Sequence, residues 1–269
     1  MFVWYRGNMS LHIDLGRRVA LVTGGARGVG RGITRSLVEA GATVVTCSRS
    51  DVTPVEGTTH RVCDVRDPEA VADLVAGIVE AHGRLDVLVN NVGGAPVTPA
   101  ATTSPRLHAK VIELNLFAPL LLSQAANAVM QGQPEGGAIV NISSVSALRP
   151  SPGSAAYSAA KAGLDALTRS LAVEWAPKVR VNAINVGPVR PDDPATVTDH
   201  YGGEAGIAAI NATIPLGRMA EPRDVGRVAL FLASPLADYV SGSTIALHGG
   251  GETPAFLTAQ QNLAKEPTP

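Results

Sequence analysis

The chain has 269 residues, of which 45% are hydrophobic, and a formal net charge of −1. This length suffices for one large α/β domain or two small ones with a substantial core. A charge so close to zero, with no block of like charges, argues against nucleic acid or an anionic membrane as a partner and favours small neutral molecules.

The ends of the chain and its rare residue types add a few expectations. The N-terminal stretch MFVWYRGN lacks the basic start, apolar centre and cleavage site of a signal peptide, and Met9 is a candidate initiator. The most apolar long segment, 114–130, is interrupted by Asn, Pro, Ser and Gln, so no transmembrane helix is predicted. Cys47 and Cys63 are expected to be buried free thiols, and the six histidines lack metal-ligand spacing. We therefore expect a cytoplasmic protein without a metal.

The first predicted strand leads directly into a glycine-rich turn and a helix. The apolar run 18–23 is followed by GGARGVG and by a helical pattern through Ala40. A turn between strand and helix aims backbone N–H groups and the positive end of the helix dipole at one point, which suits a pyrophosphate. Gly24, Gly28 and Gly30 form the pattern Gly-x-x-x-Gly-x-Gly. A dinucleotide site is predicted here, although a glycine cluster is often only a turn.

Strand-like and helix-like segments alternate along the rest of the chain. Further strands are predicted at 43–47, 60–63, 85–90, 138–142, 179–184 and 244–247, and amphipathic helices at 68–82, 105–130, 155–175 and 222–232. This alternation predicts a doubly wound, seven-stranded parallel sheet, a Rossmann fold of the α/β class. We expect a single domain over 15–250, with an N-terminal extension (1–14) and a C-terminal tail (251–269). The short stretch 48–58, with one proline and one glycine, does not favour a crossover helix.

The strongest candidate for the chemistry is a pair in the predicted helix 155–175. Tyr157 and Lys161 stand four residues apart, so their side chains project from one face about one turn apart. A nearby ammonium favours phenolate and lowers a tyrosine pKa of about 10 by roughly 1 to 3 units, which makes proton exchange with a substrate oxygen practical. Ser144 lies 13 residues before Tyr157, where a strand runs into a loop, and its hydroxyl is expected to face the same oxygen. Alone, Tyr-x-x-x-Lys is also a common helical spacing.

Together, the glycine turn and these three residues resemble the short-chain dehydrogenase/reductase family, from about residue 15 to 250. The resemblance implies that Tyr157 is the general acid/base, that Lys161 lowers its pKa and holds the ribose, and that Ser144 binds the substrate oxygen. Asn115 matches the family's asparagine that supports a water relay to the lysine; a packing hydrogen bond is the alternative. The cofactor-binding residues implied are Gly24, Arg27, Gly28, Val29, Gly30, Ser48, Arg49, Asp64, Val65, Asn91, Gly93, Tyr157, Lys161, Gly187 and Val189.

The choice between NADP and NAD depends on the residues after the second strand. NAD sites place an acidic residue there for the ribose hydroxyls, whereas NADP sites place a basic group for the 2′-phosphate. By the family's register the acidic position is Ser48, and two neighbouring cations, Arg49 and Arg27, are able to converge on a phosphate. We therefore predict NADP(H), with NAD(H) as the alternative if Asp51 binds the ribose instead.

Three segments compare less simply with the family pattern. Asp64 resembles the aspartate that meets the adenine, but it also stands where the cap of the next helix is expected. The strand end NNVG at 90–93 resembles the family's Asn-Asn-Ala-Gly. After the sixth strand, Val186 replaces the usual proline and Pro191 the usual threonine. That threonine binds the nicotinamide carboxamide in the family, and proline has neither a hydroxyl nor an N–H to offer.

The resemblance implies an NADP(H)-dependent oxidoreductase that interconverts a secondary alcohol and a ketone, or an aldehyde, by hydride transfer on a small-molecule substrate. A non-catalytic dinucleotide-sensing regulator and a lyase or epimerase remain alternatives, because a fold alone does not dictate function. The segment 188–215 is predicted to be a loop over the substrate, and its small or apolar residues suit a bulky apolar ketone of steroid or acyl-thioester type. In the family, the helices that carry Asn115 and Tyr157 form dimers and then tetramers, which implies a homotetramer.

Overall fold

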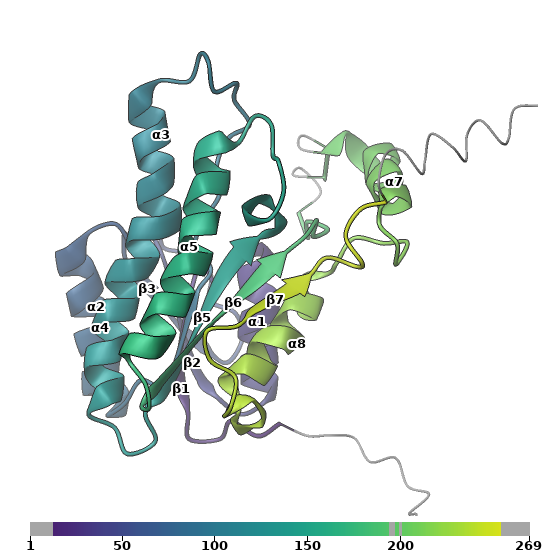
Figure 1. Cartoon of the computed structure of the whole chain (residues 1–269). Coiled ribbons are helices and arrows are strands. Elements are labelled where there is room, and N and C mark those ends of the chain that lie inside the picture. Colours follow the sequence, from purple (N-terminus) through teal and green to yellow (C-terminus); the bar gives the residue numbers. More distant parts are fainter. Residues whose placement is uncertain (1–12, 194–196, 199–200, 254–269) are drawn as a thin grey trace, which may run out of the picture.

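The computed structural model describes residues 13–193, 197–198 and 201–253. Most of the predicted N-terminal extension and C-terminal tail, together with Met9, lie outside the described residues. Seven strands form one parallel sheet in the order β3-β2-β1-β4-β5-β6-β7 (Figure 1). They are β1 (Val19–Thr23), β2 (Thr43–Ser48), β3 (Thr58–Val62), β4 (Val87–Asn90), β5 (Gly137–Ser144), β6 (Val179–Val186) and β7 (Thr244–Leu247). The predicted doubly wound sheet is confirmed, and β2 passes to β3 without a helix, as predicted.

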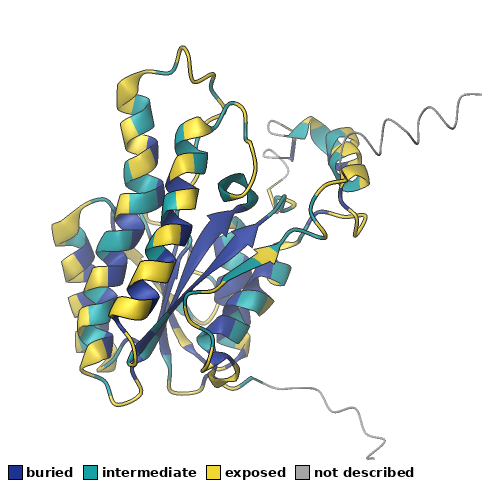
Figure 2. Cartoon of the chain, in the orientation of Figure 1, coloured by how far each residue is buried: buried dark blue, intermediate teal, exposed yellow. Residues whose placement is uncertain are grey.

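Helices cover both faces of the sheet. On one face lie α1 (Gly28–Glu39) and α8 (Pro222–Ala233), and on the other α2 (Pro68–His82), α4 (Ala118–Gln131) and α5 (Ala155–Glu174). All five residues of β1 are buried, because a strand covered on both faces has no polar side to present. Figure 2 shows the central strands buried between helices whose outer sides are exposed. The core is therefore two apolar layers, one on each face.

The structure differs from the sequence-based expectation in two segments. The predicted helix 105–130 is divided into α3 (Pro105–Ile112), a π turn η1 (Glu113–Phe117) and α4. The predicted loop 188–215 contains a helix, α7 (Gly203–Thr213), which stands away from the sheet in Figure 1. This helix forms because it buries Ile207 in a small apolar cluster of its own, with Val197, Ile214 and Met219. The loop prediction is therefore wrong for 203–213.

The strand order places one crevice at the middle of the sheet. From β1 the chain builds outward through β2 and β3, then returns to the other side of β1 and builds through β4 to β7. At such a reversal the loops after two neighbouring strands turn to opposite faces and leave a gap at the carboxyl ends. The glycine turn after β1 and the loop after β4 both begin at this point.

Cys47 and Cys63 are buried free thiols, as predicted, and burial raises the pKa of Cys47 to about 12. Within the described ranges, no helix has the length and apolar character needed to cross a membrane. In the same residues, no three His, Cys, Asp or Glu side chains gather as metal ligands do.

At the amino-terminal edge of the sheet, Asp86, which directly precedes β4, binds the start of β1 and two arginine side chains. Its side chain is 2% exposed and accepts hydrogen bonds from Arg84, from Arg18 at 3.0 Å and from the Val19 N–H at 2.8 Å. Burial raises the pKa of Asp86, but the hydrogen bonds from Arg84, Val19 and Arg18 outweigh it and hold that pKa below its usual value of 3.8. Glu135, which is exposed, also pairs with Arg84.

Replacing Asp86 by Ala is expected to lower the free energy of unfolding by about 3 kcal/mol at pH 7, because buried hydrogen-bond donors lose their acceptor. The folded-state pKa is depressed, so this contribution is present above pH 3.8 and is lost as the pH falls through the lower folded value. Urea unfolding of the wild type and the variant at pH 7 and at acidic pH measures this difference in the free energy of unfolding. Glu135→Gln is the control, expected to cost less than about 1 kcal/mol because its ion pair is exposed. Equal effects of the two substitutions would contradict this assignment.

Candidate active site

Two adjoining cavities lie at the carboxyl ends of the strands. The larger, here called the Tyr157 cavity, has a volume of about 730 Å³ and meets the ends of β1, β4, β5 and β6. The smaller, the Arg49 cavity, has about 260 Å³ and meets the ends of β1 to β4. They share Gly24, Arg27, Val92 and Gly93 in their walls, so they form one cleft across the strand-order reversal.

The structure brings nearly all the predicted site residues into this cleft. Gly24, Arg27, Gly28, Val29, Gly30, Asn91, Gly93, Ser144, Tyr157, Lys161, Gly187 and Val189 line the Tyr157 cavity, and Ser48, Arg49, Asp64 and Val65 line the Arg49 cavity. Asn115 lies behind the wall and lines neither. Pro191, at the position of the family's threonine, lines the Tyr157 cavity, and so do Asp192, Asp193 and Tyr201, which sequence reasoning missed.

The glycine turn has a shape that only glycines permit. Gly24 and Gly28 adopt left-handed backbone angles, with φ of 65° and 52°. A Cβ on Gly30 would overlap the carbonyl of Gly24 and stand 2.6 Å from the side-chain nitrogen Nδ2 of Asn91. A Cβ built on Gly28, in contrast, would have open space within 4 Å. The turn is therefore closed toward the protein and open toward the cavity at the N-terminus of α1. This arrangement fits a dinucleotide pyrophosphate.

Tyr157 and Ser144 meet on the wall of the Tyr157 cavity. Tyr157 lies in the first turn of α5, and Ser144 is the last residue of β5, where its hydroxyl accepts a hydrogen bond from the Ser146 N–H at 3.1 Å. Burial raises the pKa of Tyr157, and its hydrogen bond with Ser144 offsets this only in part. The predicted lowering of this pKa by Lys161 is therefore not what the structure shows. A phenol in this setting is protonated at neutral pH and is set to donate a proton.

Lys161 is almost wholly buried, at 3% exposure. Its Nζ donates a hydrogen bond to the Ile142 carbonyl at 2.8 Å and lies 5.6 Å from the centroid of the Tyr157 ring. Burial lowers the pKa of Lys161 to about 8, although the nearby Asp165 carboxylate raises it in part. The ammonium is thus held by a backbone carbonyl over the face of the Tyr157 ring.

No side chain fits at Gly93 beside Lys161 and Asn115. A Cβ built on Gly93 would stand 2.7 Å from Asn115 Oδ1 and 3.2 Å from Lys161 Nζ. The glycine therefore allows both polar side chains to pack closely against the loop after β4.

Asn115 is completely buried in the π turn η1. Its Nδ2 donates to the carbonyls of Val111 at 2.8 Å and Gly94 at 2.9 Å, and its Oδ1 accepts from the Gly94 N–H at 2.9 Å. The side chain therefore fixes the loop after β4 to the helix. Within α-helices, π turns are rare and occur frequently at functional sites.

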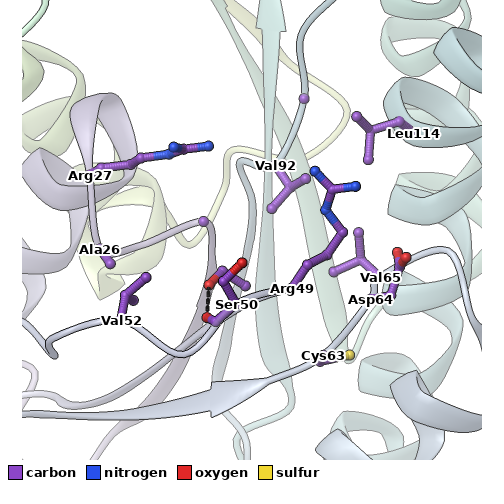
Figure 3. A pocket seen from close by; sticks show the side chains of 13 residues that line it. Ala26, Arg27, Arg49, Ser50, Val52, Cys63, Asp64, Val65, Val92 and Leu114 are labelled. Carbon is purple, nitrogen blue, oxygen red and sulfur yellow. Dashed lines mark hydrogen bonds between the residues drawn. The ribbon is translucent and has the colours of Figure 1, made fainter.

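Arg27 and Arg49 extend into the space of the Arg49 cavity from opposite sides (Figure 3). Asp64 lines the same cavity, but a hydrogen-bonded ion pair with Arg66 occupies both of its oxygens and lowers its pKa. The cap of α2 is Asp67 and not Asp64. Asp51 is exposed and is not among the residues that line the cavity. The cavity is therefore positively charged.

The chain is similar in sequence and in structure to known oxidoreductases. A family model described as enoyl-(acyl carrier protein) reductase matches residues 24–252. The 3alpha-hydroxysteroid dehydrogenase of Mediterraneibacter gnavus is 34% identical over 252 residues, covering 89% of this chain and 98% of that protein. The human dehydrogenase/reductase SDR family member 4 is 33% identical over 261 residues, covering 93% and 92%. The ligand-free structure of Thermoplasma acidophilum aldohexose dehydrogenase superposes with a TM-score of 0.83 at 29% identity, covering 88% and 94%.

The fold, the cleft and these similarities agree with one another. The matched region begins at Gly24 in the glycine turn and includes both cavities. The chain therefore belongs to the short-chain dehydrogenase/reductase family of NAD(P)-dependent oxidoreductases that act on CH–OH groups.

Proposed function

We propose that the protein is an NADP(H)-dependent enzyme that interconverts a secondary alcohol and a ketone, or an aldehyde, with Tyr157 as the general acid/base. The observation that carries this proposal is that Ser144, Tyr157 and Lys161 line the same cavity as the glycine turn. A phenol able to transfer a proton beside a predicted dinucleotide site is what such a reaction needs.

The residues of the chain divide the work of such a reaction. When bound, the dinucleotide supplies or accepts the hydride. Tyr157 donates its proton to the carbonyl oxygen during reduction and takes it back during oxidation. Ser144 binds the same oxygen through its hydroxyl and orients it toward the phenol. Lys161 stabilises the phenolate left after proton donation and holds the ribose of the cofactor.

The preference for NADP(H) rests on the charges of the Arg49 cavity. Arg27 and Arg49 supply two guanidinium groups, which bind a phosphate with paired hydrogen bonds. Asp64 is neutralised by Arg66, and Asp51 stands outside the cavity lining. Apart from Asp64, whose two oxygens are bonded to Arg66, the described residues that line this cavity include no acid that would favour the ribose hydroxyls of NAD(H).

The combined substitution Ser48→Asp and Arg49→Gln is expected to weaken NADPH binding by about 10- to 150-fold, because a hydrogen bond to a charged group contributes roughly 1.5 to 3 kcal/mol. NADH binding should strengthen. Fluorescence titration of both cofactors at two salt concentrations measures the dissociation constants, and the NADPH contact should weaken as the salt concentration rises.

Arg27→Ala should weaken NADPH binding less, because the backbone of the turn still binds the pyrophosphate. Arg169→Gln, on exposed α5 surface, is the control. Tighter binding of NADH than NADPH by the unmodified protein would refute the assignment of Arg49.

The substrate end of the cleft favours uncharged compounds. Asp192 and Asp193 line the Tyr157 cavity, and Asp192 forms an ion pair with Arg31. Among the described residues that line this cavity, the cations are Arg27 and Lys161, and both are assigned to the cofactor, so a carboxylate substrate would lack a partner of opposite charge. The cavity is large enough for a bulky ketone, and the similarity to a hydroxysteroid dehydrogenase supports that class.

A panel of neutral ketones, steroid ketones, 2-oxo acids and enoyl thioesters, followed at 340 nm with NADPH and NADP, tests the proposed reaction. We expect turnover with the neutral ketones and little with the 2-oxo acids. Turnover of the enoyl thioesters alone would replace carbonyl reduction by reduction of a carbon–carbon double bond, the reaction named in the family model's description. Conversion without net cofactor oxidation would favour the lyase or epimerase alternative.

We also propose a cytoplasmic homotetramer. Ile112 on α3, Phe117 on η1 and Val173 on α5 expose 41%, 47% and 81% of their surface on neighbouring segments, and such apolar faces favour association. Light scattering at micromolar concentration is expected to give a tetramer mass. The double substitution Phe117→Glu and Val173→Glu should shift it toward smaller species. A monomer for the unmodified protein would rule the proposal out.

A further inference from the structure

His60, on the edge strand β3, makes three hydrogen-bond contacts with the strand beside it. Its Nδ1 lies 2.9 Å from Thr46 Oγ1, and its Nε2 lies 3.1 Å from Ser48 Oγ and 3.2 Å from the Ser50 carbonyl. The parallel register places His60 directly opposite Thr46, so its ring reaches along β2 toward the end of that strand. Its contacts thus follow β2 from the strand into the turn.

The hydrogen-bond network fixes which nitrogen of His60 carries the proton. The Ser48 hydroxyl donates its hydrogen to the Ser50 carbonyl at 2.7 Å, so the oxygen of Ser48 is left as an acceptor. Both groups within reach of Nε2 are then acceptors, and Nε2 must be the donor. In the neutral ring, Nδ1 accepts from the Thr46 hydroxyl. The network is complete in this arrangement.

The two residues that His60 contacts at the end of β2 flank Arg49. Figure 3 shows the Arg49 side chain extending into the cavity from the backbone beside Ser50. Arg49 has no regular secondary structure to direct it, because β2 ends at Ser48. The imidazole and the Ser48 hydroxyl therefore both hold the Ser50 carbonyl, which fixes the backbone just after the arginine to the end of β2.

From this geometry we propose that His60 is a positioning residue that sets the preference for NADPH over NADH by fixing the turn 48–50, from which Arg49 reaches the 2′-phosphate. This rests on the proposed NADP(H) function. Binding of a phosphate by Arg49 orders both its side chain and the turn that carries it, and a turn that is already fixed removes the backbone part of that cost. NADH carries no 2′-phosphate, so its binding does not depend on where Arg49 points.

His60→Asn is the decisive variant, and His60→Gln is its matched control. The Asn amide reaches only as far as Nδ1 and loses the contacts with Ser48 and Ser50, whereas the Gln amide nitrogen reaches the position of Nε2. We expect His60→Asn to weaken NADPH binding by about 2- to 13-fold, the value of one ordinary hydrogen bond, with NADH binding unchanged. His60→Gln should retain most of the NADPH affinity. Fluorescence titration of NADPH and NADH with the unmodified protein and with each variant gives the dissociation constants without an assay of turnover.

A double-mutant cycle with Arg49→Gln shows whether His60 acts through the arginine. In the Arg49→Gln background, His60→Asn is expected to leave NADPH binding unchanged, because the group that it positions is gone. Equal weakening of NADPH and NADH by His60→Asn, or an undiminished effect in the Arg49→Gln background, would overturn the proposal.

A second variant tests the proposal if His60→Asn does not fold. Thr46→Val removes the hydroxyl that holds Nδ1 of His60, leaves β3 unchanged and alters a residue that lines neither cavity. The same loss of NADPH binding alone is expected. If Arg49→Gln itself leaves NADPH binding unchanged, the proposed cofactor assignment fails. If Arg49→Gln weakens NADPH binding but neither His60→Asn nor Thr46→Val does, only the role of His60 fails.

Discussion

Replacing Tyr157 by Phe is expected to lower kcat by about 100- to 10,000-fold and to leave the dissociation constant for NADPH within about twofold. The aromatic ring keeps its packing in the wall of the cavity, and only the hydroxyl that bonds Ser144 is lost. Steady-state kinetics on the best ketone of the panel and fluorescence titration with NADPH measure the two quantities. Because burial keeps Tyr157 protonated, ketone reduction should be insensitive to pH near neutrality, and alcohol oxidation should accelerate as the pH rises.

The fully exposed Tyr239 supplies the control for this substitution. Tyr239→Phe removes a hydroxyl from the same residue type outside the cavity and should leave kcat unchanged. If Tyr157→Phe retains more than about a tenth of the wild-type rate, the proton is transferred by another group and the assignment of Tyr157 is wrong.

Replacing Lys161 by Met is expected to lower kcat by at least about 100-fold and, at pH 7, to raise the melting temperature. The activity falls because the phenolate loses its buried cation. The stability rises because the native protein holds a charged ammonium at 3% exposure, bonded to the Ile142 carbonyl, and methionine fills a similar volume without charge. Calorimetry of both proteins, together with the kinetic assay, provides the measurement.

The sign of the pH dependence follows from the lowered pKa of Lys161. Between about pH 8, its folded value, and 10.5, its ordinary value, the unfolded chain binds a proton that the folded chain does not. The wild type therefore gains stability as the pH rises through this window, and the Met variant does not. The advantage of the variant should shrink from pH 7 to pH 10. Lys178→Met, which removes an ammonium bonded to the Gln133 and Pro134 carbonyls, is the control and should not affect kcat. A variant destabilised equally at every pH would contradict the argument.

The parts of the fold that depend on local pattern could be predicted from the sequence. Buried strands such as β1 show unbroken apolar runs, and the glycine turn and the Tyr157/Lys161 spacing carry their geometry in a few adjacent residues. Their convergence on one cleft follows from the order of strands in a doubly wound sheet. The sequence therefore located the cleft and the residues in its wall.

The rest depends on contacts between distant segments, which spacing alone does not reveal. The pKa of Tyr157 is raised because of burial, and a count of residues to Lys161 contains no information on burial. His60 meets Ser48 only through the register of β2 and β3. The helix α7 is a different case, because its apolar cluster lies within residues 197–219, and the many Ala and Gly residues of this segment hide the helical pattern from sequence reasoning.

The π turn at Glu113–Phe117 also bears on how the length of this chain can vary. Its hydrogen bonds run from residue i to i+5, so it holds one residue more than an α-helical turn. Removal of one residue here would therefore let the turn close as ordinary α-helix, and the apolar side of α4, formed by Ala118, Leu122, Ala126 and Met130, would still face the sheet. A deletion within α4 itself would instead turn everything that follows by about 100° and take this side away from the sheet. The loss of one residue at the π turn thus falls on the loop that Asn115 fixes through Gly94, and not on the packing of the core.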